Sequence, residues 1–205
     1  MTDLQCMPSL TRMIRIVTAV LCVTLAVSAY AEEPQPPTWL TTTTGCRLAV
    51  AHMIAPGPIT WSGDCVDGLG SGEGWIDEPA KGNRMHVTLK QGLADGRVVM
   101  MRHDGVIFVF NIYTNRVVNH IIIVRPDGYH YDGQFDADGK AGGHGIADFP
   151  GGFRYVGEWL HDLPNGQGAL VTADGQRLSG VWVNGCLQDA THTAVGVPAS
   201  SCRWQ

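Results

Sequence analysis

Apolar side chains recur at every second position in short stretches along the chain after residue 60. In the clearest stretch, Tyr155, Gly157 and Trp159 occupy alternate positions, which is the pattern of a β-strand with one apolar face. The Asn-Gly pair at 165–166 predicts a tight turn with positive φ, after which Gly166-x-Gly168 opens a returning strand. The Asp-Gly pair at 174–175 predicts a second turn, so the whole stretch is expected to form a β-hairpin.

The same pattern returns every 23 or 24 residues. Six units open at Trp61, Met85, Phe108, Tyr131, Tyr155 and Leu178. The glycines that recur within the units are Gly63, Gly72, Gly74, Gly133, Gly143, Gly145, Gly157, Gly166, Gly168 and Gly180. In the units at 85 and 108, Val87 and Phe110 stand where the first glycine is expected. Because a lone hairpin is marginal in water, we expect the units to stack into one elongated, single-layer antiparallel sheet over residues 45–187. Apolar runs at 98–101 and 121–124 leave open a thicker, better-buried sheet in the middle of the chain.

These residues resemble a known family. The segments 155–159, 166–168 and 174–175 look like a MORN repeat, and the resemblance covers about residues 59–187. Gly45-Cys46 and the segment 60–65 are similar to the N-terminal cap of exported bacterial MORN proteins. The resemblance implies a single-layer β-sheet rod with a binding or scaffolding role. Phospholipid contact is proposed for some eukaryotic members, but this acidic chain lacks the basic face that such contact needs.

The aromatic residues of the units are the candidate binding face. They are Tyr131, Phe135, Tyr155, Trp159 and Trp182. Their fixed positions in the unit predict that they line one face of the sheet, where their rims would form a groove for a peptide, a partner protein or a sugar chain. The alternative is that the rings pack against one another and against the Gly-x-Gly strands as a minimal core.

The first 31 residues have the features of a secretory signal peptide. Arg12 and Arg15 precede an apolar run over 16–27, which ends in Ser28-Ala29-Tyr30-Ala31. We expect a signal helix that is cleaved near Ala31, with Met13 as an alternative start. A membrane anchor is the other interpretation, but the run is shorter than the ~20 residues of a spanning helix. Residues 32–44 are expected to be a flexible leader and residues 188–205 a C-terminal cap.

Cysteine usage agrees with export. Removal of the signal leaves Cys46, Cys65, Cys186 and Cys202. An even number of cysteines in an exported chain predicts a disulfide framework, with three possible pairings. Because the ends of an extended array lie far apart, we expect each bridge to join neighbours in the sequence, Cys46 with Cys65 and Cys186 with Cys202. Such bridges would pin caps over the two ends of the sheet in a periplasmic or secreted protein.

Composition narrows the classes of partner. Glycine contributes 26 of 205 residues, against a usual share of about 7%, and shows no collagen-like period. The net charge of −5 argues against nucleic acid as a partner. The chain also lacks a basic amphipathic segment for an anionic membrane surface.

No catalytic motif is present in the sequence. It contains no H-E-x-x-H, no G-x-S-x-G and no Walker loop. The eight histidines match no metal-ligand spacing, and we expect solvated turn residues rather than a metal site. His161-Asp162 could be half of a general base pair, but the pattern places no serine or cysteine nucleophile beside it. Asp132, Asp136 and Glu158 could meet as glycosidase carboxylates, but solvent-side alternation in a sheet explains them better.

The sequence therefore predicts a non-catalytic module without cofactor or metal, which binds a partner protein of the cell envelope through its β-repeat sheet. The alternative is a glycan- or cell-wall-binding accessory protein or enzyme that uses the same sheet as a carbohydrate platform.

Overall fold

The computed structural model describes residues 37–50, 53–54, 57–188 and 193–202. The chain divides into two units, residues 1–35 and 36–205, and only the second is described here. The signal peptide expected at 1–31 and the first part of the expected leader lie outside the described residues. Within the described ranges, no helix is long and apolar enough to cross a membrane.

The described part of the chain is an all-β structure with a short 3-10 turn at Ala199–Ser201. Its strands are β1 (Leu40–Thr41), β2 (Arg47–Leu48), β3 (Thr60–Trp61), β4 (Asp64–Val66), β5 (Leu69–Glu78), β6 (Asn83–Lys90), β7 (Leu93–Ala94), β8 (Gly96–Met101), β9 (Ile107–Tyr113), β10 (Arg116–Val124), β11 (His130–Phe135), β12 (Ala141–Phe149), β13 (Phe153–Leu160), β14 (Leu163–Val171), β15 (Arg177–Val183) and β16 (Cys186–Leu187).

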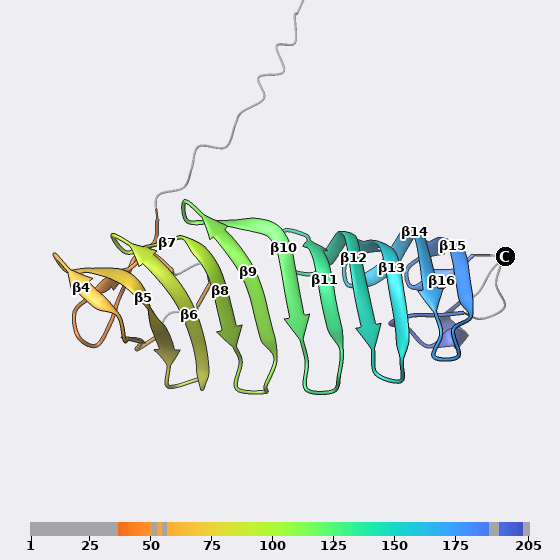
Figure 1. The fold of residues 1–205 in the computed structure, drawn as a ribbon, viewed down its shortest axis with the longest axis horizontal. Coiled ribbons are helices and arrows are strands. Elements are labelled where there is room, and N and C mark those ends of the chain that lie inside the picture. Colours follow the sequence, from red (N-terminus) through yellow and green to blue (C-terminus); the bar gives the residue numbers. More distant parts are fainter. Residues whose placement is uncertain (1–36, 51–52, 55–56, 189–192, 203–205) are drawn as a thin grey trace, which may run out of the picture. The chain divides into compact units, whose positions relative to one another are not determined.

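All these strands belong to one elongated sheet. Its order is β1-β2-β5-β6-β8-β9-β10-β11-β12-β13-β14-β15-β16, with β3 and β4 beside β5 and β7 beside β6. From β8 to β16 every strand pairs antiparallel with its successor in the sequence, as can be followed in Figure 1. The expected elongated antiparallel sheet of hairpins is confirmed, although β2 pairs with β5 in parallel at the N-terminal end. The units at 85 and 108 continue the same sheet without interruption.

One cross-strand row explains how the degenerate units fit. On the face of the sheet that carries Tyr131 and Tyr155, called the inner face below, successive strands place Val98, Phe110, Ile121, Gly133, Gly145, Gly157, Gly168 and Gly180 opposite one another. Val87 lies opposite Gly74 in the same way. Val87 is fully buried and Phe110 almost so. The row thus changes from glycines to large apolar residues as it passes into the degenerate units.

The glycines in this row make room for aromatic rings that lie flat along the sheet. A Cβ added to Gly145 would fall 2.7 Å from Cε2 of Tyr131, and one added to Gly168 would fall at the same distance from Cε2 of Tyr155. The Tyr131 hydroxyl donates to the carbonyl of Gln134 at 2.5 Å and the Tyr155 hydroxyl to that of Glu158 at 3.1 Å. Each ring therefore reaches the carbonyl three residues after it, across a surface without side chains.

Trp61 repeats this arrangement at the other end of the array. Its Nε1 donates to the carbonyl of Asp64 at 2.9 Å, and Gly63 and Gly74 leave room for its ring. In the units at 85 and 108 the first residue is Met or Phe without a polar tip, and the glycine position is filled instead. An aromatic ring that lies over glycines and a large apolar residue at the glycine position fill the same space above the sheet. The core therefore stays closely packed in both kinds of unit.

The hairpin turns differ between the two edges of the sheet. At one edge, Asp174-Gly175 forms the turn between β14 and β15, as the sequence predicts. At the other edge the expected turn at Asn165-Gly166 is wrong, because β13 and β14 are joined at His161-Asp162, with φ of 50° and 69°. Gly166 lies inside β14 at a register shift, with φ of 109°, and is therefore a bulge residue. Glu158 supports this bulge by accepting the Gln167 N–H at 2.9 Å.

Both expected disulfides are formed, and each accompanies a cap. Cys46 is joined to Cys65 and Cys186 to Cys202, with Cα–Cα distances of 5.8 and 5.6 Å. The N-terminal cap buries Leu48, Val50, Ile54 and Ile59 in one core cluster with the inner-face residues of β6, β8 and β9. At the C-terminal end, Val195 joins a second cluster with the aromatic rings. Two disulfides are typical of a protein that folds in an oxidising, extracytoplasmic environment.

Candidate functional site

Four of the five aromatic residues of the predicted binding face lie together on the inner face as core residues. Tyr131, Tyr155 and Trp182 are fully buried and Trp159 is 4% exposed, whereas Phe135 is half-buried. The four buried rings form an edge-to-face ladder, with centroid distances of 5.3 Å from Tyr131 to Trp159, 5.1 Å from Trp159 to Tyr155 and 5.2 Å from Tyr155 to Trp182. Burial leaves little of these rings for a partner.

The opposite face of the sheet, called the outer face below, carries an exposed surface. Residues paired directly across ten strands form one row, consisting of Trp75, His86, Val99, Val109, Ile122, Asp132, Ile146, Val156, Ala169 and Ser179. Directly paired residues on one face lie about 5 Å apart. We call this set the outer row, and its middle is mostly aliphatic. Ile146 and Val156 are each 41% exposed.

A shallow groove of about 350 Å³ opens beside the most exposed part of the outer row. Its lining includes Ile146 and Val156, with Gly145 and Gly157 next to them, and His120 and Asp132. Nε2 of His120 lies 2.8 Å from Oδ1 of Asp132. The groove therefore combines two exposed aliphatic side chains with a hydrogen-bonded His–Asp pair.

The aromatic end of the outer row is covered. The Arg84 guanidinium carbon lies 4.5 Å from the centroid of the Trp75 ring, and the His86 ring packs against Trp75 at 4.8 Å. Arg84 also donates to Asp77 at 2.6 Å. The exposed part of the row is thus aliphatic rather than aromatic.

Sequence reasoning missed the outer row because it followed the recurring aromatic positions. Val156 is the x of Tyr155-x-Gly157, and Ile146 follows Gly145, so both occupy positions at which the repeat pattern specifies no residue type. The signal that could have revealed the row lies at the position of Ile146, where three successive units hold a β-branched residue, Val99, Ile122 and Ile146.

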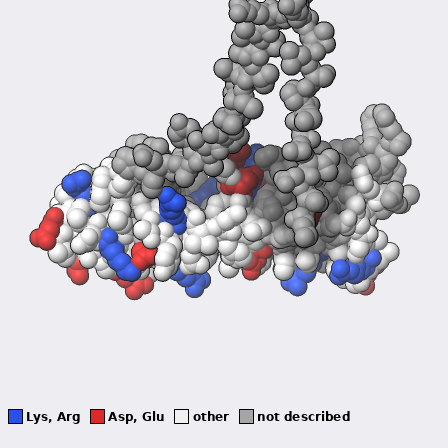
Figure 2. All heavy atoms as spheres, turned by 90° about the horizontal axis from the view of Figure 1, so that it is seen from above, with Lys and Arg blue, Asp and Glu red and all other residues white. Residues whose placement is uncertain are grey.

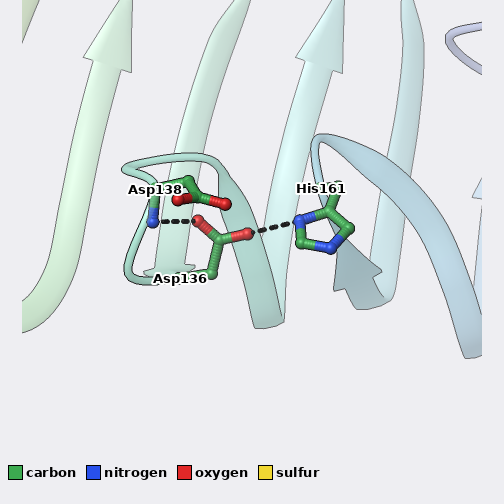
Figure 3. Close-up of side chains that lie close together, drawn as sticks. All are labelled: Asp136, Asp138 and His161. Carbon is green, nitrogen blue, oxygen red and sulfur yellow. Dashed lines mark hydrogen bonds and ion pairs between the residues drawn. The ribbon is translucent and has the colours of Figure 1, made fainter.

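Asp136, Asp138 and His161 form the one cluster of potential metal ligands among the described residues, and Figure 3 shows it between two hairpin tips. Oδ1 of Asp136 accepts the backbone N–H groups of Asp138 and Lys140, each at 3.0 Å. Oδ2 of Asp136 lies 2.8 Å from Nδ1 of His161. Hydrogen bonds to the carboxylate, above all from the backbone N–H of Lys140, hold the pKa of Asp136 below its usual range. A cation here would have to displace these hydrogen bonds. The cluster is better explained as a structural contact that joins the tips of two neighbouring hairpins.

The three carboxylates considered for glycosidase chemistry have separate partners. Asp132 faces His120, Glu158 holds the bulge amide of Gln167, and Asp136 caps its own turn. Asp162, the neighbour of His161, accepts the backbone N–H of Ala141 at 2.7 Å. Each of these carboxylates therefore has a local structural role in the described part of the chain.

Charges of both signs are interspersed over the face seen in Figure 2. On the outer face Arg154 pairs with Asp148 at 2.5 and 2.9 Å, and the hydrogen bond from Arg154 holds the pKa of Asp148 below its usual range. A surface of mixed sign does not provide the continuous positive field that a polyanion would require.

Comparison with known proteins adds no family to this description. No family model matches the chain, and no curated protein matches it significantly. The function is therefore argued from the chemistry of the surfaces described above.

Proposed function

We propose that this chain is an exported, MORN-like repeat protein that acts as a non-catalytic binding module of the cell envelope and holds a partner protein on its outer face. The observation that carries the proposal is the pair of exposed aliphatic side chains Ile146 and Val156, which lie side by side in the outer row between Asp132 and the buried Ala169. This pair lies on a sheet whose other face is already filled by the aromatic ladder.

The chemistry of the outer row favours a protein over a glycan. The cores of protein interfaces are apolar and poor in charge, with polar groups around the rim. The groove next to Ile146 and Val156 fits this description, since its polar side chains, His120, Asp132 and His144, lie beside the aliphatic pair. A sugar ring needs an accessible aromatic surface, and the ring in this row, Trp75, is covered by Arg84.

Export is supported by the two disulfides and by the signal-like sequence of residues 1–31. A non-reducing peptide mass map of the protein isolated from the envelope is expected to give a mature N-terminus near Glu32 and both bridges. An intact residue 1–31 segment together with reduced cysteines would contradict the proposed location.

The binding face is tested by placing a photo-crosslinking side chain at Val156 in the protein expressed in its own host. We expect one adduct of defined mass with an envelope protein, because Val156 lies at the centre of the proposed contact. The matched control is Val66, which is 55% exposed but lies on β4, outside the outer row.

Ile146→Lys provides the second arm. Ile146 faces solvent, so the long lysine stem can lie on the sheet with its charge in water and the fold is retained. The Val156 adduct is expected to disappear in this variant and to persist with Val66→Lys. An adduct formed equally well from Val66, or one unaffected by Ile146→Lys, would refute the outer face as the binding surface.

A further inference from the structure

A half-enclosed cleft of about 370 Å³ opens on the inner face, beyond the buried aromatic ladder. Its walls include Arg125 and Asp127 from the turn between β10 and β11, Tyr129 before β11, Phe149 at the end of β12, and Asp162 from the tip between β13 and β14. A volume of this size is within the usual range for sites that hold a small molecule. The cleft lies on the opposite face from the outer row, and its occupation is independent of the function proposed above.

The C-terminal tail closes one side of this cleft. Val195 and Gly196 belong to its lining, and the Val195 N–H donates to the carbonyl of Gly185 at 2.8 Å. The disulfide between Cys186 and Cys202 ties the same segment to β16. The wall is thus preformed, which reduces the entropic cost of binding a ligand there.

Two aromatic rings in the cleft differ from those of the ladder because they keep exposed surface. Tyr129 and Phe149 are only half-buried, and their ring centroids lie 5.4 Å apart at an interplanar angle of 66°. The Arg125 guanidinium carbon lies 4.4 Å from the centroid of the Tyr129 ring. An apolar ring surface is therefore presented together with a planar, fivefold hydrogen-bond donor.

Hydrogen-bond acceptors line the cleft at both edges of the sheet. Oδ1 of Asp127 accepts the Tyr129 N–H at 2.9 Å, and Oδ1 of Asp162 accepts the Ala141 N–H at 2.7 Å. Within the described ranges, the second oxygen of each carboxylate has no protein donor. Burial, reinforced by Asp162 and Asp127 against the opposing effect of Arg125, raises the pKa of Tyr129 to about 12. The phenol is therefore a hydroxyl, able both to donate and to accept a hydrogen bond.

We propose that this cleft binds a neutral saccharide of one or two rings. The C–H face of a pyranose is apolar and stacks on an aromatic ring such as Phe149, since Arg125 covers one face of Tyr129. Its vicinal hydroxyls donate and accept at once, which matches a cleft lined by two carboxylates and a guanidinium. The three charged side chains sum to −1, which disfavours an anionic ligand.

The test is a two-dimensional amide NMR titration of the disulfide-intact protein with chitobiose, cellobiose and maltose, each to about 20 mM, since a dissociation constant near 1 mM is expected for a site with few contacts. Shifts should concentrate at Tyr129, Phe149 and the Trp159 indole. Trp159 lines the cleft, and its indole N–H donates to the Gly145 carbonyl at 3.1 Å.

A double variant, Arg125→Ala with Asp162→Asn, separates binding from folding. Asn retains the oxygen that accepts the Ala141 N–H and tolerates the positive φ of 69° at this position. We expect the variant to keep the native spectrum outside the cleft and to bind the responding sugar at least about tenfold more weakly. Arg97→Ala, an exposed arginine on the outer face, is the matched control and should bind normally.

Three results would overturn the proposal: no site-specific shift with any of the three sugars, shifts that cluster on the outer row, or binding unchanged in the double variant. The first and third results do not bear on the Val156 crosslink, whereas sugar shifts on the outer row would favour the carbohydrate alternative for that face. Failure of the cleft and failure of the outer face are therefore distinguishable.

Discussion

Replacing Gly168 by alanine tests the central packing element of the sheet, the tyrosine ring that lies along a track of glycines. A Cβ at position 168 would overlap the Tyr155 hydroxyl and would lie 2.5 Å from its Cζ. Tyr155 has no room to give way, because it is fully buried and its centroid is held 5.1 Å from that of Trp159 and 5.2 Å from that of Trp182. One methyl group is therefore expected to distort the ladder.

The expected cost is at the upper end of the range for overpacking, about 3 kcal/mol. For a folded part of this size, that loss lowers the melting temperature by roughly 9 °C. Gly180→Ala is the control, since a Cβ there would meet only the flexible end of Leu187, at 2.9 Å. This second substitution should cost less than about 1 kcal/mol, because a terminal methyl group can rotate away.

The assay is urea unfolding of both variants with the disulfides intact, followed by near-ultraviolet circular dichroism. Tyr155→Phe completes a double-mutant cycle. It removes the atom closest to the new methyl and the hydrogen bond to Glu158, which is worth about 1 kcal/mol. Combined with Gly168→Ala, it should be less destabilising than the sum of the two changes by about 1 kcal/mol. A Gly168→Ala variant no less stable than Gly180→Ala, or fully additive effects, would refute the glycine-track argument.

Three other predictions follow from the fold. Val87→Gly restores the repeat consensus but should destabilise the protein by about 3 kcal/mol in urea unfolding, because no tyrosine ring covers that position. Replacing Cys186 and Cys202 by serine should cost about 3 kcal/mol by the chain-entropy model, with faster amide exchange in β15 and β16 as the direct readout. The pKa of Asp136 is depressed in the folded state, so its stabilising effect is complete above about pH 4 and is lost as the pH falls through the lower folded value; thermal melts from pH 5 to 2 should show a smaller acid loss for Asp136→Asn.

Each of these three predictions would be contradicted by a specific result. A Val87→Gly variant of wild-type stability would mean that the degenerate units leave that space unfilled. Uniform exchange throughout the sheet after removal of the C-terminal bridge would mean that the cap is not a local device. Identical acid profiles for the parent and Asp136→Asn would mean that the hydrogen bonds of Asp136 between the hairpin tips do not stabilise the fold.

Much of the architecture could be read from the sequence. The 23- or 24-residue period predicts the hairpins and their serial order, and the turn at Asp174-Gly175 follows from its residue types. The disulfide pairing follows from the separation of the array's ends. These features depend on local chemistry and on one repeated pattern, which a single sequence displays.

The position of one hairpin tip could not be predicted in the same way. Asn165-Gly166 has the residues of a tight turn, yet the chain turns at His161-Asp162. The register shift in β14 absorbs the glycine as a bulge that Glu158 stabilises, and this side-chain contact is made across two strands. Local turn propensity carries no information about such a partner.

The candidate binding surfaces could not be predicted from the sequence for a related reason. Alternation places Tyr155 and Val156 on opposite faces, but it does not say which face is covered. The caps and the aromatic ladder fill the inner face, and only the register across ten strands shows that Ile146 and Val156 belong to one exposed row. Tyr129 and Phe149 lie outside the repeat pattern and meet because β11 and β12 pair in antiparallel register.

Serial pairing of neighbouring strands has a consequence for how such a chain can evolve and fold. From β8 onward each strand needs only its predecessor and its successor, and each disulfide closes within 16 or 19 residues. Duplication or loss of one hairpin therefore changes the length of the protein while leaving every remaining strand pair intact. Growth of the folded sheet can likewise follow the chain as it emerges from a pore, one hairpin at a time, with no strand waiting for a distant partner.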